Sequence, residues 1–427
     1  MQFYTSVLFA GEIGVIVTID FVAMVRDLIL ALAFVARKMS SMDRGRVSLM
    51  VAALLVSNWP LVAGQAPASD KQPLAEDVFK NVQVLRGIPV SEFMATMGFF
   101  SASLGLNCVY CHVPESLEDW NKFADDVPRK RIARTMIQMV NTINKNNFGG
   151  RRMVTCYSCH HGNERPKNIP SLAIQYGTPE EDPNEIEIPT PAVGGPSAEQ
   201  ILDKYVVALG GSPRLTVLTS LTAQGTYEGY DSYHEKVPFE LYAEAPAKMA
   251  TVIHTQNGDA TTVLNGSEGW VASPSNPVLL LPLAPGAELD GAHLDAQLFF
   301  PARIAEALGQ WRSGFPITSI GDTDVQVIQG TGAGGTRVKL FFDQKTGLLL
   351  RQLRYSSTIV GTNPVQVDYA DYRDVNGVKR PYRWIVTWTN GQSTYQVNEF
   401  QSAVAIDSGK FAKPAPAVLA PAKTVAR

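Results

Sequence analysis

The spacing of hydrophobic residues predicts two helices in the first half of the chain. Ser91 is expected to cap the first helix, and the Gly-Leu-Asn sequence at 105–107 is expected to break it. Its single apolar face carries Phe93, Met97, Phe100 and Leu104. The second helix is predicted to open at Asp126 and Pro128 and to end near Gly149. Its apolar stripe consists of Ile132, Met136, Met139, Val140 and Ile143.

Alternation of apolar and polar residues predicts antiparallel strands in the second half, from Leu215 to about Phe400. Turn-forming pairs separate the apolar runs at Asn257-Gly258, Asn265-Gly266, Gly334-Gly335, Asn376-Gly377 and Asn390-Gly391. A capping box at 197–200 opens a short helix before the strands, and a further helix is predicted over 299–311. The predicted fold class is therefore multidomain α + β, with a helical N-terminal domain and a mainly antiparallel β domain.

The length of 427 residues predicts two or three domains, and changes in composition place their boundaries. We expect a helical domain over 69–170, a Pro-rich linker over 171–196 and a β-rich domain over 197–405. A Pro/Ala-rich tail is predicted over 406–427, its stretch from Pro414 to Ala422 disordered. The slightly acidic net charge of −3 argues against a nucleic-acid partner, which would need a basic face.

All four cysteines fall inside two copies of one motif, CxxCH, at Cys108–His112 and Cys156–His160. In this motif the two thiols, Cys108 with Cys111 and Cys156 with Cys159, bind haem vinyl groups covalently, and the histidine reaches the iron. A zinc site built from the four thiolates is the alternative, but it leaves His112 and His160 unexplained. The motifs therefore predict two haem c groups and no disulfide.

Covalent haem attachment outside the cytoplasm requires export, and residues 1–68 are expected to contain the export signal. Arg44 and Arg46 precede an apolar run at 47–56, and small residues follow at 63, 64 and 66. This pattern predicts a signal peptide that starts at Met42 and a periplasmic protein, with no cysteine for a lipid anchor. The first 41 residues are either an upstream extension, which we favour, or an additional membrane anchor.

The sixth ligand of each iron decides between electron transfer and catalysis. Each predicted helix leads into a CxxCH motif and carries two methionines three residues apart: Met94 with Met97, and Met136 with Met139. Methionine on an apolar helix face is more often a core residue than a ligand. Next to a haem motif, however, one methionine of each pair is a candidate iron ligand, and its thioether would raise the reduction potential.

The segment from about Phe79 to Pro166 resembles the cytochrome c subunit of bacterial photosynthetic reaction centres. The resemblance is carried by residues 97–112, MGFFSASLGLNCVYCH, and by residues 133–144, ARTMIQMVNTIN, which lead to VTCYSCH at 154–160. It implies Met97 and Met136 as sixth ligands, and a membrane reaction centre as partner. The family subunit has four haems and this chain has cysteines for two, so a shorter relative that serves another respiratory or photosynthetic chain is equally compatible.

Basic residues cluster around the second helix. They are Arg129, Lys130, Arg131, Arg134, Arg151 and Arg152. They either compensate haem propionates and steer an acidic partner, or form a solvated helix face, and the sequence favours neither interpretation. His161, beside His160, is expected to be an exposed histidine rather than a further ligand.

Residues 197–405 loosely resemble the half-barrels of lipoprotein carriers, in which a curved antiparallel sheet wraps a helix and an apolar cavity. The phrases that carry this resemblance are Gly269-Trp270, residues 341–351 (FFDQKTGLLLR) and residues 372–381 (YRDVNGVKRP). It implies a fold, and only weakly a function. Three scattered histidines, at 234, 254 and 293, are expected to be ordinary surface or core residues.

These observations favour an electron carrier, not an enzyme, that exchanges electrons with periplasmic redox proteins. One alternative is a peroxidase-like dihaem enzyme, which needs an open or displaceable sixth position on one iron. Another is a haem-based redox sensor whose β domain binds a lipophilic ligand. Carbon monoxide binding to the reduced protein separates the enzyme from the carrier, and co-purified lipid would support the sensor.

Overall fold

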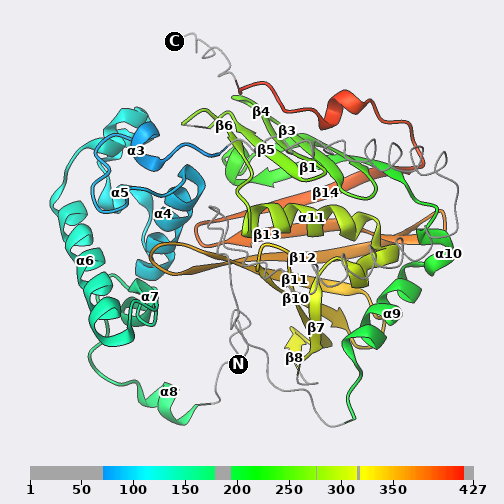
Figure 1. Cartoon of the computed structure of the whole chain (residues 1–427), viewed down its shortest axis with the longest axis horizontal. Coiled ribbons are helices and arrows are strands. Elements are labelled where there is room, and N and C mark those ends of the chain that lie inside the picture. Colours follow the sequence, from blue (N-terminus) through cyan, green and yellow to red (C-terminus); the bar gives the residue numbers. More distant parts are fainter. Residues whose placement is uncertain (1–70, 178–193, 276, 315–317, 418–427) are drawn as a thin grey trace, which may run out of the picture. The chain divides into compact units, whose positions relative to one another are not determined.

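A computed structural model describes residues 71–177, 194–275, 277–314 and 318–417 (Figure 1). The predicted export signal, most of the predicted linker and the last ten residues of the predicted tail lie outside the described residues. Residues from the start of the described chain to its end form one compact unit. Within that unit, a helical N-terminal region is followed by a large antiparallel sheet, as the sequence predicts.

The N-terminal region consists of short helices around two longer ones, α4 (Val90–Leu104) and α6 (Pro128–Phe148). Both end at a glycine in the left-handed conformation, Gly105 with φ 65° and Gly149 with φ 61°, which confirms both predicted helix ends. The shorter elements are α3 (Ala75–Val78), α5 (Cys108–Cys111), η1 (Pro114–Leu117), η2 (Trp120–Ala124), α7 (Cys156–His160) and α8 (Leu172–Tyr176).

The predicted cap of the first long helix is wrong by two residues. Pro89 occupies the N-cap position of α4, so Ser91 lies inside the first turn. The backbone N–H of Ser91 instead donates a hydrogen bond to Gln72 Oε1 at 3.0 Å. A side chain from an earlier segment thus satisfies one of the free N–H groups at the start of the helix, a role that local sequence does not reveal.

The second half of the described chain forms one antiparallel sheet, in the order β6-β5-β4-β3-β2-β1-β14-β13-β12-β11-β10-β9-β7, with β8 paired to β9 (Figure 1). Its first strands are β1 (Ser220–Gly229), β2 (Lys236–Glu244), β3 (Lys248–Thr255), β4 (Gly258–Asn265), β5 (Glu268–Ser273) and β6 (Leu279–Pro282). The later strands are β7 (Gly309–Ser313), β8 (Thr318–Ile320), β9 (Thr323–Thr331), β10 (Arg337–Asp343), β11 (Leu349–Ser357), β12 (Thr362–Val375), β13 (Val378–Trp388) and β14 (Gly391–Ser402).

Hairpin turns set most of this strand order. All five predicted turn pairs lie at or between consecutive strands, for example Asn376-Gly377 between β12 and β13, where Asn376 has φ 55° and Gly377 has φ 81°. Among the described strands, a long-range pairing joins β1 to β14, with Tyr227 opposite Tyr395. This pairing holds the first and last strands of the sheet side by side, although some 160 residues separate them in the chain.

Two helices, α9 (Ala198–Leu209) and α11 (Ala287–Phe299), pack on the sheet. The predicted capping box opens α9, because Ser197 and Gln200 exchange side-chain and backbone hydrogen bonds. Leu202 and Tyr205 of α9 pack in one core with Leu294 of α11 and with strand residues. A short helix α10 (Ser212–Leu215) connects α9 to the sheet.

The helix predicted over 299–311 is wrong, because α11 ends where that segment begins. Pro301 starts a 3-10 helix, η4 (Pro301–Glu306), and the following residues form the strand β7, which pairs with β9. Proline cannot donate the backbone hydrogen bond that a continuing helix needs. The observed helix, α11, has Gly291 in its interior, and glycine has a low helix propensity, so the sequence lacks a strong helical signal. A Cβ at this position would lie 2.8 Å from the Arg354 guanidinium.

The predicted tail begins with residues that pack against the sheet. A single turn, η5 (Ser408–Phe411), buries Phe411 to 1% exposure against Trp270 and Val263. Lys410 lies 4.4 Å from the Tyr242 ring centroid. The ordered chain therefore extends to at least η5.

Candidate cofactor site

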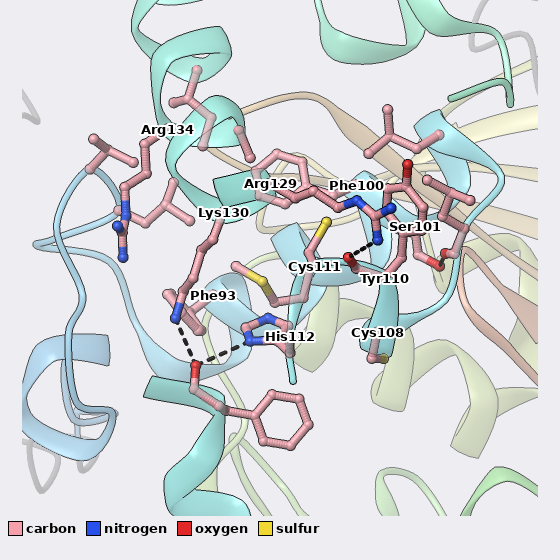
Figure 2. A pocket seen from close by; sticks show the side chains of 18 of the residues that line it. Phe93, Phe100, Ser101, Cys108, Tyr110, Cys111, His112, Arg129, Lys130 and Arg134 are labelled. Atoms are coloured by element: carbon pink, nitrogen blue, oxygen red, sulfur yellow. Dashed lines mark hydrogen bonds between the residues drawn. The ribbon is translucent and has the colours of Figure 1, made fainter. Parts of the chain in front are cut away.

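A cavity of about 680 Å³ lies among the helices of the N-terminal region. Its walls combine apolar side chains with residues of both CxxCH motifs. Figure 2 shows the part of the wall around the first motif, with Cys108, Cys111 and His112. The apolar lining includes Phe93, Met94, Met97, Phe100, Leu104, Met136 and Ile137. The lining from the motifs includes Cys108, Cys111, His112, Cys156 and His160. Its size and character are those of a site for a large, mostly apolar ligand.

The first motif forms α5, directly after the glycine that ends α4. Burial raises the pKa of the Cys111 thiol, while Cys108 is exposed. His112 Nδ1 lies 3.1 Å from the Phe123 carbonyl oxygen, and this oxygen can only accept, so Nδ1 carries the proton. The Nε2 atom of His112 therefore keeps a lone pair, which is the form in which imidazole binds a metal.

The same carbonyl oxygen of Phe123 accepts a second hydrogen bond, from Lys130 Nζ at 2.7 Å (Figure 2). Burial lowers the pKa of His112, and the nearby Lys130 charge lowers it further. Burial also lowers the pKa of Lys130. The arrangement thus favours a neutral His112 ring in a fixed orientation.

The second motif forms α7, which a capping box opens: Thr155 and Ser158 satisfy each other's backbone N–H groups. His160 Nδ1 lies 3.0 Å from the Asn163 carbonyl oxygen, so this ring too carries its proton on Nδ1. Burial raises the pKa of the Cys156 thiol, and Cys159 is exposed. His161 is exposed as predicted, in the left-handed conformation with φ 46°.

Asn144 holds the chain just before the second motif, a role that the sequence did not reveal. Its side chain, on α6, is 5% exposed. Asn144 Oδ1 accepts hydrogen bonds from the backbone N–H groups of Met153 and Val154, both at 3.0 Å. Its Nδ2 donates to the Val154 carbonyl oxygen at 2.7 Å. The available signal was a polar residue four positions after Val140, on the buried face of the helix.

The structure distinguishes the methionines of the second pair. Met136 lines the cavity, whereas Met139 is 44% exposed on α6 and lies outside the lining. Both members of the first pair, Met94 and Met97, line the cavity, and Met97 also packs in the cluster around Phe99. Met97 and Met136 thus lie on the same cavity as the two motif histidines.

The predicted basic cluster divides into two groups. Arg129, Lys130 and Arg134 line the cavity. Arg129 stacks over the Tyr110 ring, 3.8 Å from its centroid, and donates to the Tyr110 carbonyl oxygen at 3.2 Å (Figure 2). Arg134 pairs with Asp126 at 2.8 Å.

The other group consists of Arg131, Arg151 and Arg152, which lie outside the cavity lining. Arg131 and Arg151 are exposed, as a solvated face predicts. Arg152 donates to the Gly361 carbonyl oxygen at 3.3 Å, between β11 and β12. The interpretation as a solvated face therefore describes Arg131 and Arg151, whereas Arg129, Lys130 and Arg134 lie on the cavity.

The histidines of the sheet region take part in ordinary polar contacts. His254 Nδ1 lies 2.9 Å from Asp259 Oδ1, and His293 Nε2 lies 2.7 Å from the Gly266 carbonyl oxygen. Over the described residues, histidine, cysteine and carboxylate side chains form no group of three or more that could hold a metal ion. None of the described helices has the length and apolar character that a membrane span requires.

The residues of the cavity fit covalently bound haem. Four cysteines are free, in two pairs at the CxxCH spacing, and the histidine of each motif has Nδ1 at a carbonyl oxygen, which leaves Nε2 as the nitrogen available to a metal. Apolar side chains dominate the walls, and Arg129, Lys130 and Arg134 supply positive charge for carboxylate groups. A zinc site from the four thiolates does not use these histidines and does not need the apolar cavity.

Comparison with known proteins confirms the resemblance of the N-terminal region. Residues 49–187 match the family described as photosynthetic reaction centre cytochrome C subunit, and this range contains both motifs and both long helices. The photosynthetic reaction center cytochrome c subunit of Thermochromatium tepidum is 39% identical over 106 residues, 24% of this chain and 25% of that protein. The corresponding subunit of Roseobacter denitrificans is 35% identical over 105 residues, 23% of this chain and 28% of that protein. The chain thus spans about a quarter of the length of these curated relatives.

Solved structures similar to this chain cover about half of it. A LolA superfamily protein from Nitrosomonas europaea is 17% identical, covers 51% of this chain and 99% of its own, and gives a TM-score of 0.35. A DUF1329 family protein from Desulfovibrio piger is 10% identical, covers 50% of this chain and 97% of its own, and also gives a TM-score of 0.35.

Proposed function

We propose that this protein is a dihaem c-type cytochrome that transfers single electrons between redox partners outside the cytoplasm. One haem is bound by Cys108 and Cys111, the other by Cys156 and Cys159. His112 and His160 are the proximal iron ligands. The family model that spans both motifs is described as a photosynthetic reaction centre cytochrome C subunit, and the relatives are named as cytochrome c subunits, which supports this assignment.

The observation that carries the proposal is the same hydrogen-bond arrangement at both motif histidines. Each ring donates its Nδ1 proton to a backbone carbonyl oxygen, at 3.1 Å for His112 and 3.0 Å for His160. Such a bond fixes the ring orientation and leaves Nε2 to bind a metal. Haem, when bound, supplies a one-electron couple at its iron. The chain's own part is to orient the ligands and to exclude water with an apolar lining.

We further propose Met97 and Met136 as the sixth ligands, on α4 and α6 respectively. Both line the cavity that the motif histidines share, and Met139 does not. A thioether opposite an imidazole favours the reduced state, and a saturated iron has no position for substrate. On this proposal the protein is an electron carrier and not an enzyme.

The partners we propose are redox proteins, among them a membrane reaction centre or a respiratory complex. The names of the relatives point to a reaction centre, but this chain matches only about a quarter of their length. We propose a periplasmic location, reached through the export signal predicted at residues 42–66 and with membrane association through its partner or an N-terminal anchor. A lipophilic ligand of the sheet region is not part of the proposal.

Carbon monoxide binding tests the proposal directly. Reduced holoprotein from a host that attaches haem covalently should show no spectral change with carbon monoxide, because both irons have six ligands. The variants Met97→Ala and Met136→Ala should each bind carbon monoxide at one haem, and Met139→Ala, the matched control for Met136 on α6, should not. Ready binding by the wild-type protein at one haem would instead favour a peroxidase-like enzyme.

A further inference from the structure

The cavity is not built by the helical region alone, because two residues of the sheet region also line it. These residues are Tyr230, in the short helix η3 (Tyr230–Ser232) after β1, and Asn390, in the turn between β13 and β14. Both follow the second motif in sequence, Tyr230 by 70 residues after His160 and Asn390 by 230. We propose that Tyr230 and Asn390 form the outer wall of the first haem site, the site of Cys108, and that this wall raises the reduction potential of that haem. The proposal rests on the proposed function above.

The turn that carries Asn390 is in direct contact with the helix that leads into the first motif. A Cβ at Gly98 of α4 would lie 2.6 Å from Thr389 Oγ1 and 2.8 Å from Asn390 Oδ1. Real Cβ atoms do not approach so closely, so the side chains of the turn contact the helix backbone at Gly98, and a larger residue there would displace them. Gly98 follows Met97 directly, so the turn contacts the helix beside a candidate iron ligand.

A second contact fixes the same helix to the neighbouring hairpin. Asn363 Nδ2, on β12, donates to the Ala95 carbonyl oxygen of α4 at 2.9 Å. Phe99 of α4 packs against Gly361, where a Cβ would lie 2.2 Å from its ring, and Val360 is buried in the cluster that contains Phe99. Two hairpin ends of the sheet therefore hold α4, and the wall cannot move freely relative to the first motif.

Tyr230 is held in place from its own side of the cavity. Its ring packs edge-on against Trp388, with 5.8 Å between the ring centroids, and its backbone N–H donates to Ser393 Oγ at 3.4 Å. Gly391 lies close behind Trp388, since a Cβ there would be 2.4 Å from the indole. Tyr230 is 48% exposed, and the partial burial of its ring together with the neighbouring Cys108 raises its pKa, in agreement with a ring that has one side towards the first motif.

The aromatic wall has an electrostatic consequence for a redox group. Oxidation adds one positive charge to a haem, and water at the haem edge stabilises that charge. An apolar ring that excludes water therefore favours the reduced form and raises the potential. Since Tyr230 lies near Cys108, and Asn390 contacts α4 at Gly98 beside Met97, the effect should be confined to the first haem.

The test compares the reduction potentials of holoprotein variants by spectroelectrochemical titration. The variant Tyr230→Ala removes the ring, and Tyr230→Phe keeps it. Tyr233→Ala is the matched control, because Tyr233 lies three residues away, is 73% exposed and does not line the cavity. The double variant Cys156→Ser, Cys159→Ser retains only the first haem and so identifies its titration wave.

For Tyr230→Ala we expect the reduction equilibrium of the first haem to shift roughly tenfold towards the oxidised form, about 59 mV for a one-electron couple. The potential of the second haem should not change in Tyr230→Ala. In Tyr230→Phe and Tyr233→Ala, both potentials should stay at wild-type values. Asn390→Ala should shift the same wave in the same direction, which keeps the test valid if Tyr230→Ala fails to fold. If the potential of the first haem did not shift, or if both potentials shifted equally, the proposed role of Tyr230 and Asn390 would be refuted. Wild-type protein that attaches no haem would instead refute the proposed function.

Discussion

Replacement of Asn144 by alanine should release the segment that leads into the second CxxCH motif. The side chain makes three hydrogen bonds to the backbone of Met153 and Val154, at 2.7 to 3.0 Å. Each such bond contributes about 1 kcal/mol net, so the variant should lose about 3 kcal/mol of local stability. At about 1.4 kcal/mol per tenfold change, this loss corresponds to roughly 100-fold.

The Val154 amide is the best reporter of this change, because Asn144 Oδ1 is the acceptor of its hydrogen bond. Hydrogen exchange of the holoprotein, measured by mass spectrometry, should show this amide exchanging roughly 100-fold faster in Asn144→Ala. Asn144→Asp keeps the acceptor oxygen and loses only the bond to the Val154 carbonyl oxygen, so we expect this amide to exchange about fivefold faster than in the wild type. Asn147→Ala is the control, since Asn147 donates only to Ile143 of its own helix, at 3.1 Å. Exchange in Asn144→Ala within about threefold of wild type would refute the reasoning.

Three further predictions concern the ligands, the contact with the sheet and a buried carboxyl group. Met97→His and Met136→His should each lower the potential of one haem, and unchanged potentials in redox titration would show that the methionines are core residues. Gly98→Ala should lower the free energy of unfolding by about 1–3 kcal/mol in urea titrations, because its Cβ would collide with Thr389; an unchanged midpoint would contradict this contact. Burial raises the pKa of Asp231 above its ordinary value of 3.8, so the folded protein binds this proton more tightly than the unfolded chain does. The contribution of Asp231 to the free energy of unfolding should therefore fall as pH rises from 3.8 through the pKa of the folded protein. Urea midpoints measured across this pH range should show the decrease in the wild type, and Asp231→Asn should remove it.

Local signals in the sequence predicted the parts of the fold that depend on neighbouring residues. Gly105 and Gly149 end their helices because left-handed backbone favours glycine, and the capping box at 197–200 opens α9. The Asn-Gly pairs mark hairpins for the same reason. The periodicity of α4 and α6 also placed Met97 and Met136 on apolar faces, and both line the cavity.

Features that depend on tertiary contacts could not be predicted in this way. Asp295 of α11 is paired with Arg354 on β11 at 2.9 Å, so the buried face of that helix carries a charge and its apolar stripe is interrupted. The role of Asn144 depends on how residues 149–154 fold back along α6. Tyr230 and Asn390 reach the cavity only because β1 pairs with β14, a register that no local pattern specifies.

The covalent attachment of two haems is the central claim, and the intact mass of purified holoprotein tests it most directly. Protein produced in a host that matures c-type cytochromes should carry two haem additions. Removal of either cysteine pair, Cys108 with Cys111 or Cys156 with Cys159, should leave one. A colourless protein, or a mass without haem additions, would contradict the account.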